Sequence, residues 1–479
     1  MKDNFDDNFF DDFDGDSEEF DDSEYQEDLA SLNEFYRSVK SNPVVYDLDS
    51  LEDYIGLALE LGEFEIGLEL TEAYLKFSNY DAEIWQKKGI FHSYLGDFEE
   101  AEESLKKAYS LNPTDIETIL NLASIYEKLS IPDQELYYLE QAVQLAPDNS
   151  DVKMQLVYFY EDNDFDKAVQ VLNEMIENDP ENIELLSELA YCYELYEYYD
   201  DAIKTYQRIL EIEPYNHLIY YNLGVAYSEK KEWNNAIESF KFAIAINEEF
   251  SSAHFNLGYT YASLGNHKEA IECYRRTLEL DPDDYSAWYN LGVSYEELGD
   301  LYKALNAYTK SIDINPQNTN SYIARGYCYN ELGKTQLAIN DFDKAIEISP
   351  DDKAGWIAKG DLEYSLGNLS EAIINYLKAI ELDPYDPEPY LNVASTYYEL
   401  GNIQFALKYY DDCISYCPYV TEPYYQKAKI LILLNQTNDA FRYLEESFRL
   451  DKEKQSQFEK EFPDIASTKD YQKRFNKRS

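Results

Sequence analysis

A repeat of 34 residues constrains the fold of this chain more than any other feature of its sequence. Successive prolines in one series are separated by 34 residues or by twice that number, with a single gap of 33. Alanines and a set of small residues form two further series in the same phase. Self-similarity at a fixed period is the signature of stacked structural units, so the sequence predicts one extended repeat array.

The segment at residues 285–318 predicts what each repeat folds into. Trp288, Leu291 and Tyr295 follow one another at spacings of three and four residues, which places them on one face of a helix. A Leu-Gly-Asp turn comes next, and a second apolar helix then runs to Pro316, which cannot continue a helix. Because two such helices cannot bury their apolar faces alone, neighbouring repeats are expected to stack.

This pattern of W-x2-L-G-x2-Y, then A-x3-F/Y, then P, resembles the tetratricopeptide repeat. Twelve repeats, numbered 1 to 12 below, are predicted at residues 48–81, 82–115, 116–149, 150–182, 183–216, 217–250, 251–284, 285–318, 319–352, 353–386, 387–420 and 421–454. The resemblance implies an all-α fold, a right-handed α-solenoid whose first helices line a concave groove. It also implies a binding function without naming a partner.

Four repeats depart from the pattern. Gly67 replaces the expected alanine in repeat 1, and Glu135 replaces it in repeat 3. Repeat 4 is one residue short, within the stretch EDNDFDKA. In repeat 6 Glu248 stands where the proline is expected, so the sequence predicts one long helix through residue 249.

The segments that flank the array have a different composition. Residues 1–28 hold fourteen acidic residues and five phenylalanines, which predicts a disordered tail that either solubilises the chain or docks into a basic, apolar groove. Residues 29–47 are expected to be an N-terminal capping helix and linker, with the helix at 29–40. The array follows at 48–454, and residues 455–479 are expected to be a C-terminal capping helix with a basic tail.

Net charge limits the class of partner. At −56 the chain repels phosphate backbones and anionic lipid, which excludes nucleic acid and membrane surfaces and favours basic protein partners. None of the five cysteines forms a C-x-x-C pair, so reduced thiols and a cytoplasmic location are expected. The N-terminus does not have the pattern of a secretory signal, and no apolar run reaches membrane-spanning length.

The sequence offers no recognisable catalytic constellation. It has no phosphate-binding glycine loop, no HExxH and no GxSxG motif, so no enzymatic activity, metal or cofactor is expected. The four histidines are scattered along the chain. His92 and His254 replace aromatic residues that are packed in other repeats, and we expect both to be satisfied core residues.

An amide recurs on the first helix of several repeats and gives the best functional signal. Because each helical residue turns by about 100°, Asn290 points away from Trp288, toward the face that the resemblance assigns to the groove. The candidate peptide-binding residues share this face and are Asn121, Asn222, Asn256, Asn290, Asn392, Tyr221, Phe255, Tyr259 and Tyr289. An amide both donates and accepts, which suits a peptide main chain, and aromatic rings supply apolar area. The alternative is that the amides bond only to water or to a neighbouring helix.

These observations predict a non-catalytic scaffold or adaptor that binds an extended peptide segment of another protein in the groove. Two alternatives remain open. One is an acidic chaperone or assembly factor for basic client proteins, driven by the charge of the whole surface. The other is a regulatory subunit whose active site lies on another chain. The partner and the oligomeric state are left open by the sequence.

Overall fold

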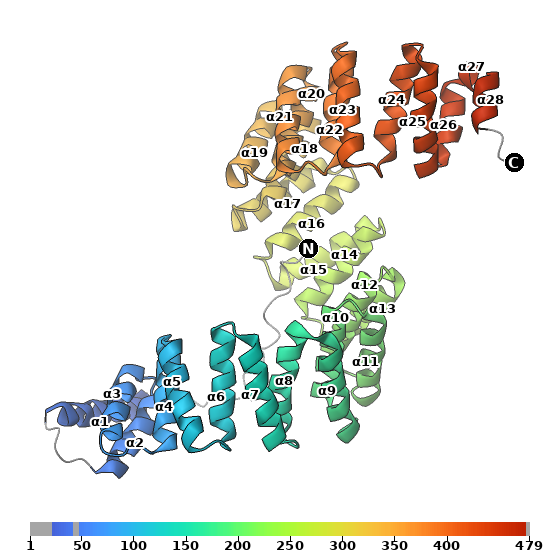
Figure 1. The fold of residues 1–479 in the computed structure, drawn as a ribbon. Coiled ribbons are helices and arrows are strands. Elements are labelled where there is room, and N and C mark those ends of the chain that lie inside the picture. The colour runs from blue at the N-terminus through green and yellow to red at the C-terminus, as the bar shows by residue number, and fades with distance from the viewer. Residues whose placement is uncertain (1–21, 42–46, 476–479) are drawn as a thin grey trace. The chain divides into compact units, whose positions relative to one another are not determined.

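The computed structural model describes residues 22–41 and 47–475, and all the regular secondary structure in these ranges is α-helical (Figure 1). The prediction of an all-α solenoid of stacked repeats is confirmed. The chain divides into two compact parts, residues 1–205 and residues 206–479, which we call the N-terminal part and the C-terminal part and describe separately.

The helices follow the repeat closely. In the N-terminal part they are α1 (Asp22–Ser41), α2 (Leu48–Glu60), α3 (Phe64–Leu75), α4 (Ala82–Leu95), α5 (Phe98–Leu111), α6 (Ile116–Lys128), α7 (Pro132–Leu145), α8 (Ser150–Asn163), α9 (Phe165–Asn178) and α10 (Ile183–Leu195). Helix α11 (Tyr199–Ile212) crosses the boundary between the parts.

In the C-terminal part the helices are α12 (His217–Glu229), α13 (Trp233–Ile246), α14 (Ser251–Ser263), α15 (His267–Leu280), α16 (Tyr285–Glu297), α17 (Leu301–Ile314), α18 (Thr319–Glu331), α19 (Thr335–Ile348), α20 (Lys353–Ser365), α21 (Leu369–Leu382), α22 (Pro387–Glu399), α23 (Ile403–Tyr416), α24 (Thr421–Leu433), α25 (Thr437–Leu450), α26 (Glu453–Glu461), α27 (Pro463–Ala466) and α28 (Lys469–Phe475). From α2 to α25, even numbers mark the first helix of a repeat and odd numbers the second.

Short polar signals explain where the helices begin and end. The last residue of most repeats is Asp or Asn, and its side chain caps the first helix of the next repeat; Asp284, for example, accepts a hydrogen bond from the Ala287 N–H at 2.8 Å. Inside every repeat except repeat 4, the turn between the two helices contains one left-handed residue. Gly299 has this role in repeat 8, with a φ of 76°, because glycine adopts a positive φ without steric cost.

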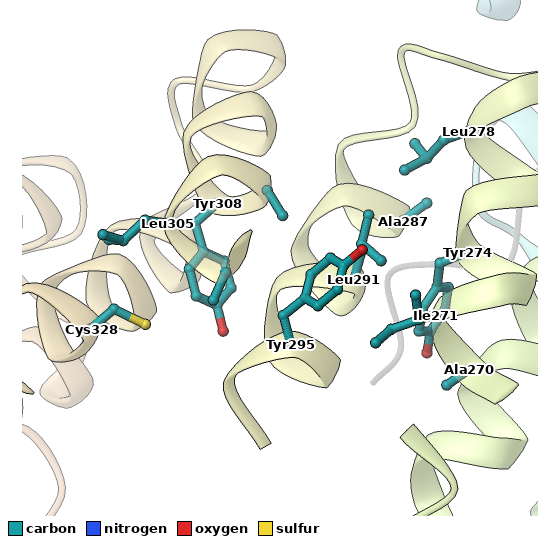
Figure 2. Packing of buried hydrophobic residues seen from close by; sticks show 12 residues of the cluster. Ala270, Ile271, Tyr274, Leu278, Ala287, Leu291, Tyr295, Leu305, Tyr308 and Cys328 are labelled. Atoms are coloured by element: carbon teal, nitrogen blue, oxygen red, sulfur yellow. The ribbon is translucent and has the colours of Figure 1, made fainter. Parts of the chain in front are cut away.

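In many repeats a glycine of the first helix, repeated at the same phase, lies against an aromatic ring of the second helix. A Cβ atom added to Gly292 would lie 2.5 Å from the ring of Tyr308 on the second helix, so the glycine makes room for that ring. Figure 2 shows the core around this contact, where Tyr308, Leu305 and Cys328 pack on one side and Tyr295 and Leu291 on the other. The same glycine-on-aromatic contact occurs at Gly224, Gly258, Gly326 and Gly360.

The join at residue 249 contradicts the prediction of one long helix. Helix α13 ends at Ile246 and α14 begins at Ser251. The chain turns at Asn247, whose side chain accepts a hydrogen bond from the Glu249 N–H at 3.1 Å and whose carbonyl accepts one from the Phe250 N–H at 3.3 Å. The same turn occurs at Asp281, Asn315 and Asp383, where a proline follows, so this turn ends the helix with or without the proline.

The N-terminal flank also differs from its prediction. Helix α1 begins at Asp22, seven residues before the expected start, so residues 22–28 are helical and were wrongly assigned to the disordered tail. The rest of the predicted tail, residues 1–21, lies outside the described residues.

The C-terminal flank folds into three short helices, α26, α27 and α28, in place of one capping helix, and residues 476–479 of the expected basic tail lie outside the described residues. Phe458 and Tyr471 are fully buried and pack with Phe441 and Phe448 of repeat 12. Arg474, from the segment expected to be a tail, donates two hydrogen bonds to Glu445 at 2.5 and 2.8 Å. These aromatic residues cover the apolar end of repeat 12.

The missing residue of repeat 4 shortens the turn between its helices. Asp164 alone separates α8 from α9; it follows the last residue of α8 and caps the start of α9, where its side chain accepts a hydrogen bond from the Lys167 N–H at 3.4 Å. The left-handed residue of the other turns is absent here. The deletion therefore falls at the turn and leaves both helices at their full length.

Candidate partner-binding wall

Consecutive first helices touch one another in the C-terminal part. Helix α14 contacts α12 and α16, and α18 contacts α16 and α20. We call the surface formed by α12, α14, α16, α18 and α20 the first-helix wall. It carries three of the five predicted asparagines on adjacent helices, namely Asn222, Asn256 and Asn290. Asn392 lies on α22 in the same part, and Asn121 lies on α6 in the N-terminal part.

All five asparagines are half-buried, and they are not equivalent. The Asn256 side chain donates to the Tyr221 hydroxyl at 2.9 Å and so links repeat 7 to repeat 6. The Asn290 side chain donates to the Ser286 carbonyl of its own helix at 2.9 Å. The Asn121 amide nitrogen is buried without a hydrogen-bond partner. Within the described ranges the side chains of Asn222 and Asn392 make no hydrogen bond.

The amide oxygens of the three wall asparagines accept no hydrogen bond from any described residue. The two bonds of Asn256 and Asn290 use one N–H each, so each amide keeps a second N–H and its carbonyl oxygen. The alternative in which an amide bonds to a neighbouring helix therefore holds for one donor of Asn256, whereas Asn290 bonds to its own helix. The carbonyl oxygens of both side chains remain available.

The four predicted aromatic residues separate into two groups. Tyr221, Phe255 and Tyr289 are half-buried, and their rings lie 5.7 to 5.9 Å from Phe240, Tyr274 and Tyr308 of the second helices. Burial raises the pKa of Tyr289. Tyr259 is exposed at 39%. The first group therefore helps to hold the two helices of each repeat together, and Tyr259 is the most exposed of the four rings.

Further residues of interest lie in repeats 4 and 5, and of these the sequence pattern indicated only Tyr191 as a groove residue. Tyr158 and Tyr191 occupy the repeat position of Tyr259 and are exposed at 39% and 50%. Beside them are Glu161, which is buried, and Glu188, which is half-buried. The repeat register contained a signal for this cluster, because Glu188 stands 34 residues before Asn222 and thus in the asparagine series.

The histidine expected in the core of repeat 7 has a structural role. In repeats 2, 8 and 10 a tryptophan indole donates to a backbone carbonyl six residues earlier; Trp288, for example, donates to Pro282 at 3.0 Å. His254 is at the same position, with its Nε2 atom 3.2 Å from the Glu248 carbonyl. Burial lowers the pKa of His254. His254 therefore has the hydrogen bond that was predicted, but it is half-buried and not part of the core.

His92 is largely buried, with its Nδ1 atom 3.5 Å from the Asp97 carboxylate. None of the five cysteines is in a disulfide; four are buried and Cys273 is half-buried. Across residues 22–41 and 47–475, His, Cys, Asp and Glu side chains do not gather into a group that could hold a metal ion. In the same ranges, no helix combines the length and the apolar character needed to cross a bilayer.

The fold and the first-helix wall define a class of protein, a helical repeat scaffold built to interact with other proteins. The chain belongs to the tetratricopeptide repeat family. Models described as TPR repeat or tetratricopeptide repeat match more than half of it, at residues 82–115, 159–217, 217–250, 258–299, 285–318, 319–352, 360–401, 387–419 and 421–454.

Individual relatives are more distant. The BBSome complex member BBS4 of Bos taurus is 26% identical over 135 residues, which are 28% of this chain and 26% of that protein. The chain thus spans about a quarter of the length of that curated relative. The crystal structure of MamA is 30% identical over 32% of this chain and 89% of its own, with a TM-score of 0.31. Yeast Tom70 is 16% identical over 90% of this chain and 99% of its own, with a TM-score of 0.47.

Proposed function

We propose that this protein is a non-catalytic adaptor that binds an extended segment of a partner protein along the first-helix wall. One observation carries the proposal: three adjacent first helices each present a half-buried amide whose oxygen accepts nothing from the described residues, at Asn222, Asn256 and Asn290. An extended peptide offers backbone N–H groups to such acceptors whatever its sequence. The half-burial shields the bonds from competing water and strengthens them.

Tyr259 and the edges of the half-buried rings supply the apolar part of this site. Tyr259 projects from α14, the central helix of the three. An aromatic side chain gives a large contact area at a low cost in conformational entropy, which suits a surface that accepts side chains of varied shape. The amides thus hold the partner's main chain, and the rings contact its side chains.

Replacing Asn222, Asn256 and Asn290 together by alanine tests the proposal. Three hydrogen bonds of about 1 kcal/mol each predict a loss of affinity on the order of 100-fold. The assay is capture of partner proteins by the immobilised full-length chain, followed by mass spectrometry and then by titration of the strongest partner. A matched control replaces Asn234, Asn306 and Asn340, which are exposed on second helices. Equal capture by the two triple variants would contradict the proposal.

The net charge of −56 supports a second candidate function, an acidic chaperone or assembly factor for basic clients. Binding driven by the surface field weakens steeply as salt rises, because the Debye length falls to about 10 Å at 0.1 M salt. Binding through the wall amides depends much less on salt. A salt titration of the captured partner therefore distinguishes the two functions, and a cytoplasmic location is part of both proposals.

A further inference from the structure

Two acidic side chains of neighbouring first helices meet in the N-terminal part without a cation. Glu161, in the last turn of α8, is only 7% exposed, and its Oε1 atom is buried without a hydrogen-bond partner. Glu188 on α10 faces it. The Tyr196 hydroxyl donates to the Glu161 carbonyl at 2.6 Å and holds the end of α10 against α8.

The charges around this pair have one sign. Glu188 from α10 and Asp162, next to Glu161 on α8, are the charged groups that act on Glu161. No lysine or arginine of the described residues forms an ion pair with Glu161 or Glu188. Burial, followed by the proximity of Glu188, raises the pKa of Glu161 to about 9. The free protein therefore keeps a proton on this pair near neutral pH, because two unpaired carboxylates are costly to bury together.

Two exposed tyrosines flank the carboxyl groups. Tyr158 precedes Glu161 by one turn on α8, and Tyr191 follows Glu188 by one turn on α10. Their rings are exposed at 39% and 50%, although both phenols lie close enough to the acids that burial and these charges raise the pKa of Tyr158 and Tyr191. The π face of an exposed aromatic ring attracts cations. The carboxyl groups and the tyrosine rings thus both favour a cationic ligand.

We propose that Glu161, Glu188, Tyr158 and Tyr191 form a binding site for a cationic side chain, an ammonium or a guanidinium group, in a basic segment of a partner protein. The site deepens the proposed adaptor function and rests on it for the presence of a partner, but its helices are not those of the first-helix wall. When the cation enters between the two carboxyl groups, the shared proton leaves to solvent, so that one positive charge replaces another. The tyrosine rings contact the alkyl stem and the cationic head.

If the two carboxyl groups only share a proton and bind no ligand, the expected effect of a cationic peptide differs from that of a binding site. Such a pair keeps its proton whether or not a cationic peptide is present, and its replacement by a neutral amide has no effect on binding. Release of a proton on binding is therefore the readout that separates the two, since a purely structural pair would not produce it.

The test uses the full-length chain and a blocked peptide, Gly-Gly-Arg-Gly-Gly, with its citrulline counterpart as a neutral probe. Calorimetry in two buffers of different ionisation enthalpy measures binding and proton release near neutral pH. We expect the arginine peptide to bind with release of close to one proton and the citrulline peptide to bind at least about tenfold more weakly. Equal binding of the two peptides would overturn the proposal.

Variants assign the effect to this site. Glu161→Gln is expected to abolish proton release and to weaken arginine-peptide binding by about tenfold, whereas Glu177→Gln, an exposed acid on α9, changes neither. Tyr191→Leu, at an exposed position, provides a second test if the first variant folds poorly; it should weaken binding with both acids intact. Unchanged binding in Glu161→Gln and Tyr191→Leu contradicts the site. The Asn222, Asn256 and Asn290 triple variant binds this probe normally, so failure of the wall proposal and failure of the cation site are distinguishable.

Discussion

The side chain of Asn256 donates a hydrogen bond to the hydroxyl of Tyr221, one repeat earlier, at 2.9 Å. The two residues lie on α14 and α12, so the bond joins adjacent first helices of the wall. In a repeat protein, stability is the sum of the stabilities of the repeats and of the interfaces between neighbours. This bond therefore stabilises the interface between repeats 6 and 7. The two residues that form it are also candidates for binding a partner.

Removal of this bond should weaken the interface between repeats 6 and 7. Tyr221→Phe and Asn256→Ala are each expected to cost about 1 kcal/mol, and the double variant should cost less than the sum because each single change already removes the bond. Chemical denaturation, with hydrogen exchange to localise the effect to α12 and α14, measures the coupling. Asn222→Ala is the control, as its side chain makes no hydrogen bond within the described residues. Additive costs in the double variant would show that the bond contributes nothing.

The turn of repeat 6 offers a stabilising substitution. Lys231 has a φ of 59°, in the left-handed region that glycine occupies in seven other turns of the chain. Because a side chain is strained in this region, Lys231→Gly should raise the free energy of unfolding by about 1 kcal/mol. Thermal denaturation measures the change. The control is Lys230→Gly, whose φ of −74° is right-handed and needs no glycine; it should destabilise the protein.

The helix pairs were predictable because residues close together in the sequence determine where each helix begins and ends. Apolar spacing, the glycine turn and the proline that ends the second helix all act within one repeat. Because the sequence repeats, the same helix pair forms again in each repeat along the chain. The break at Asn247 was not predictable from the proline series because the turn at this position depends on an Asn or Asp side chain, which repeats with the proline also use. Local polar chemistry can end a helix in more than one way.

The candidate site was only partly predictable. Helical phase placed Asn222, Asn256 and Asn290 on one wall, since phase depends on residue number alone. It did not indicate that Asn290 bonds to Ser286 of its own helix, because that bond depends on the side-chain rotamer. The repeat register places Glu188 in the asparagine series, but it does not indicate that Glu161 is buried beside it, because that burial depends on how α8 and α10 pack.

The close contact of Gly67 with Phe91 explains why repeat 1 has a glycine where alanine is usual. A Cβ atom on Gly67 would lie 2.2 Å from the ring of Phe91, which is fully buried. Gly67→Ala should therefore destabilise the N-terminal part by about 1 to 3 kcal/mol through overpacking. The double variant Gly67→Ala with Phe91→Leu should recover part of this loss, because the smaller side chain makes room for the added methyl group.

Denaturation of these variants tests the compensation, and Gly56→Ala is a matched control. Gly56 also lies inside a helix, α2, but an added Cβ there would meet nothing within 4 Å. Alanine should stabilise that helix by about 0.5 to 1 kcal/mol, since it restricts the unfolded chain more than glycine does. If Gly67→Ala stabilised the protein as Gly56→Ala is expected to, the close contact with Phe91 would not constrain the residue.

The pair of Glu161 and Glu188 should make the stability of the N-terminal part fall as pH rises. Burial raises the folded-state pKa of Glu161 from 4.5 to about 9, so between these values the folded protein holds a proton that the unfolded chain has lost. The stability that this proton contributes is fully present below pH 4.5 and is lost as pH rises through about 9. Hydrogen exchange of α8 and α10 across this range should show the loss. Because the other acidic residues also contribute, the comparison is with Glu161→Gln, which cannot titrate and should have a flatter profile; identical profiles in the two proteins would contradict a buried, protonated Glu161.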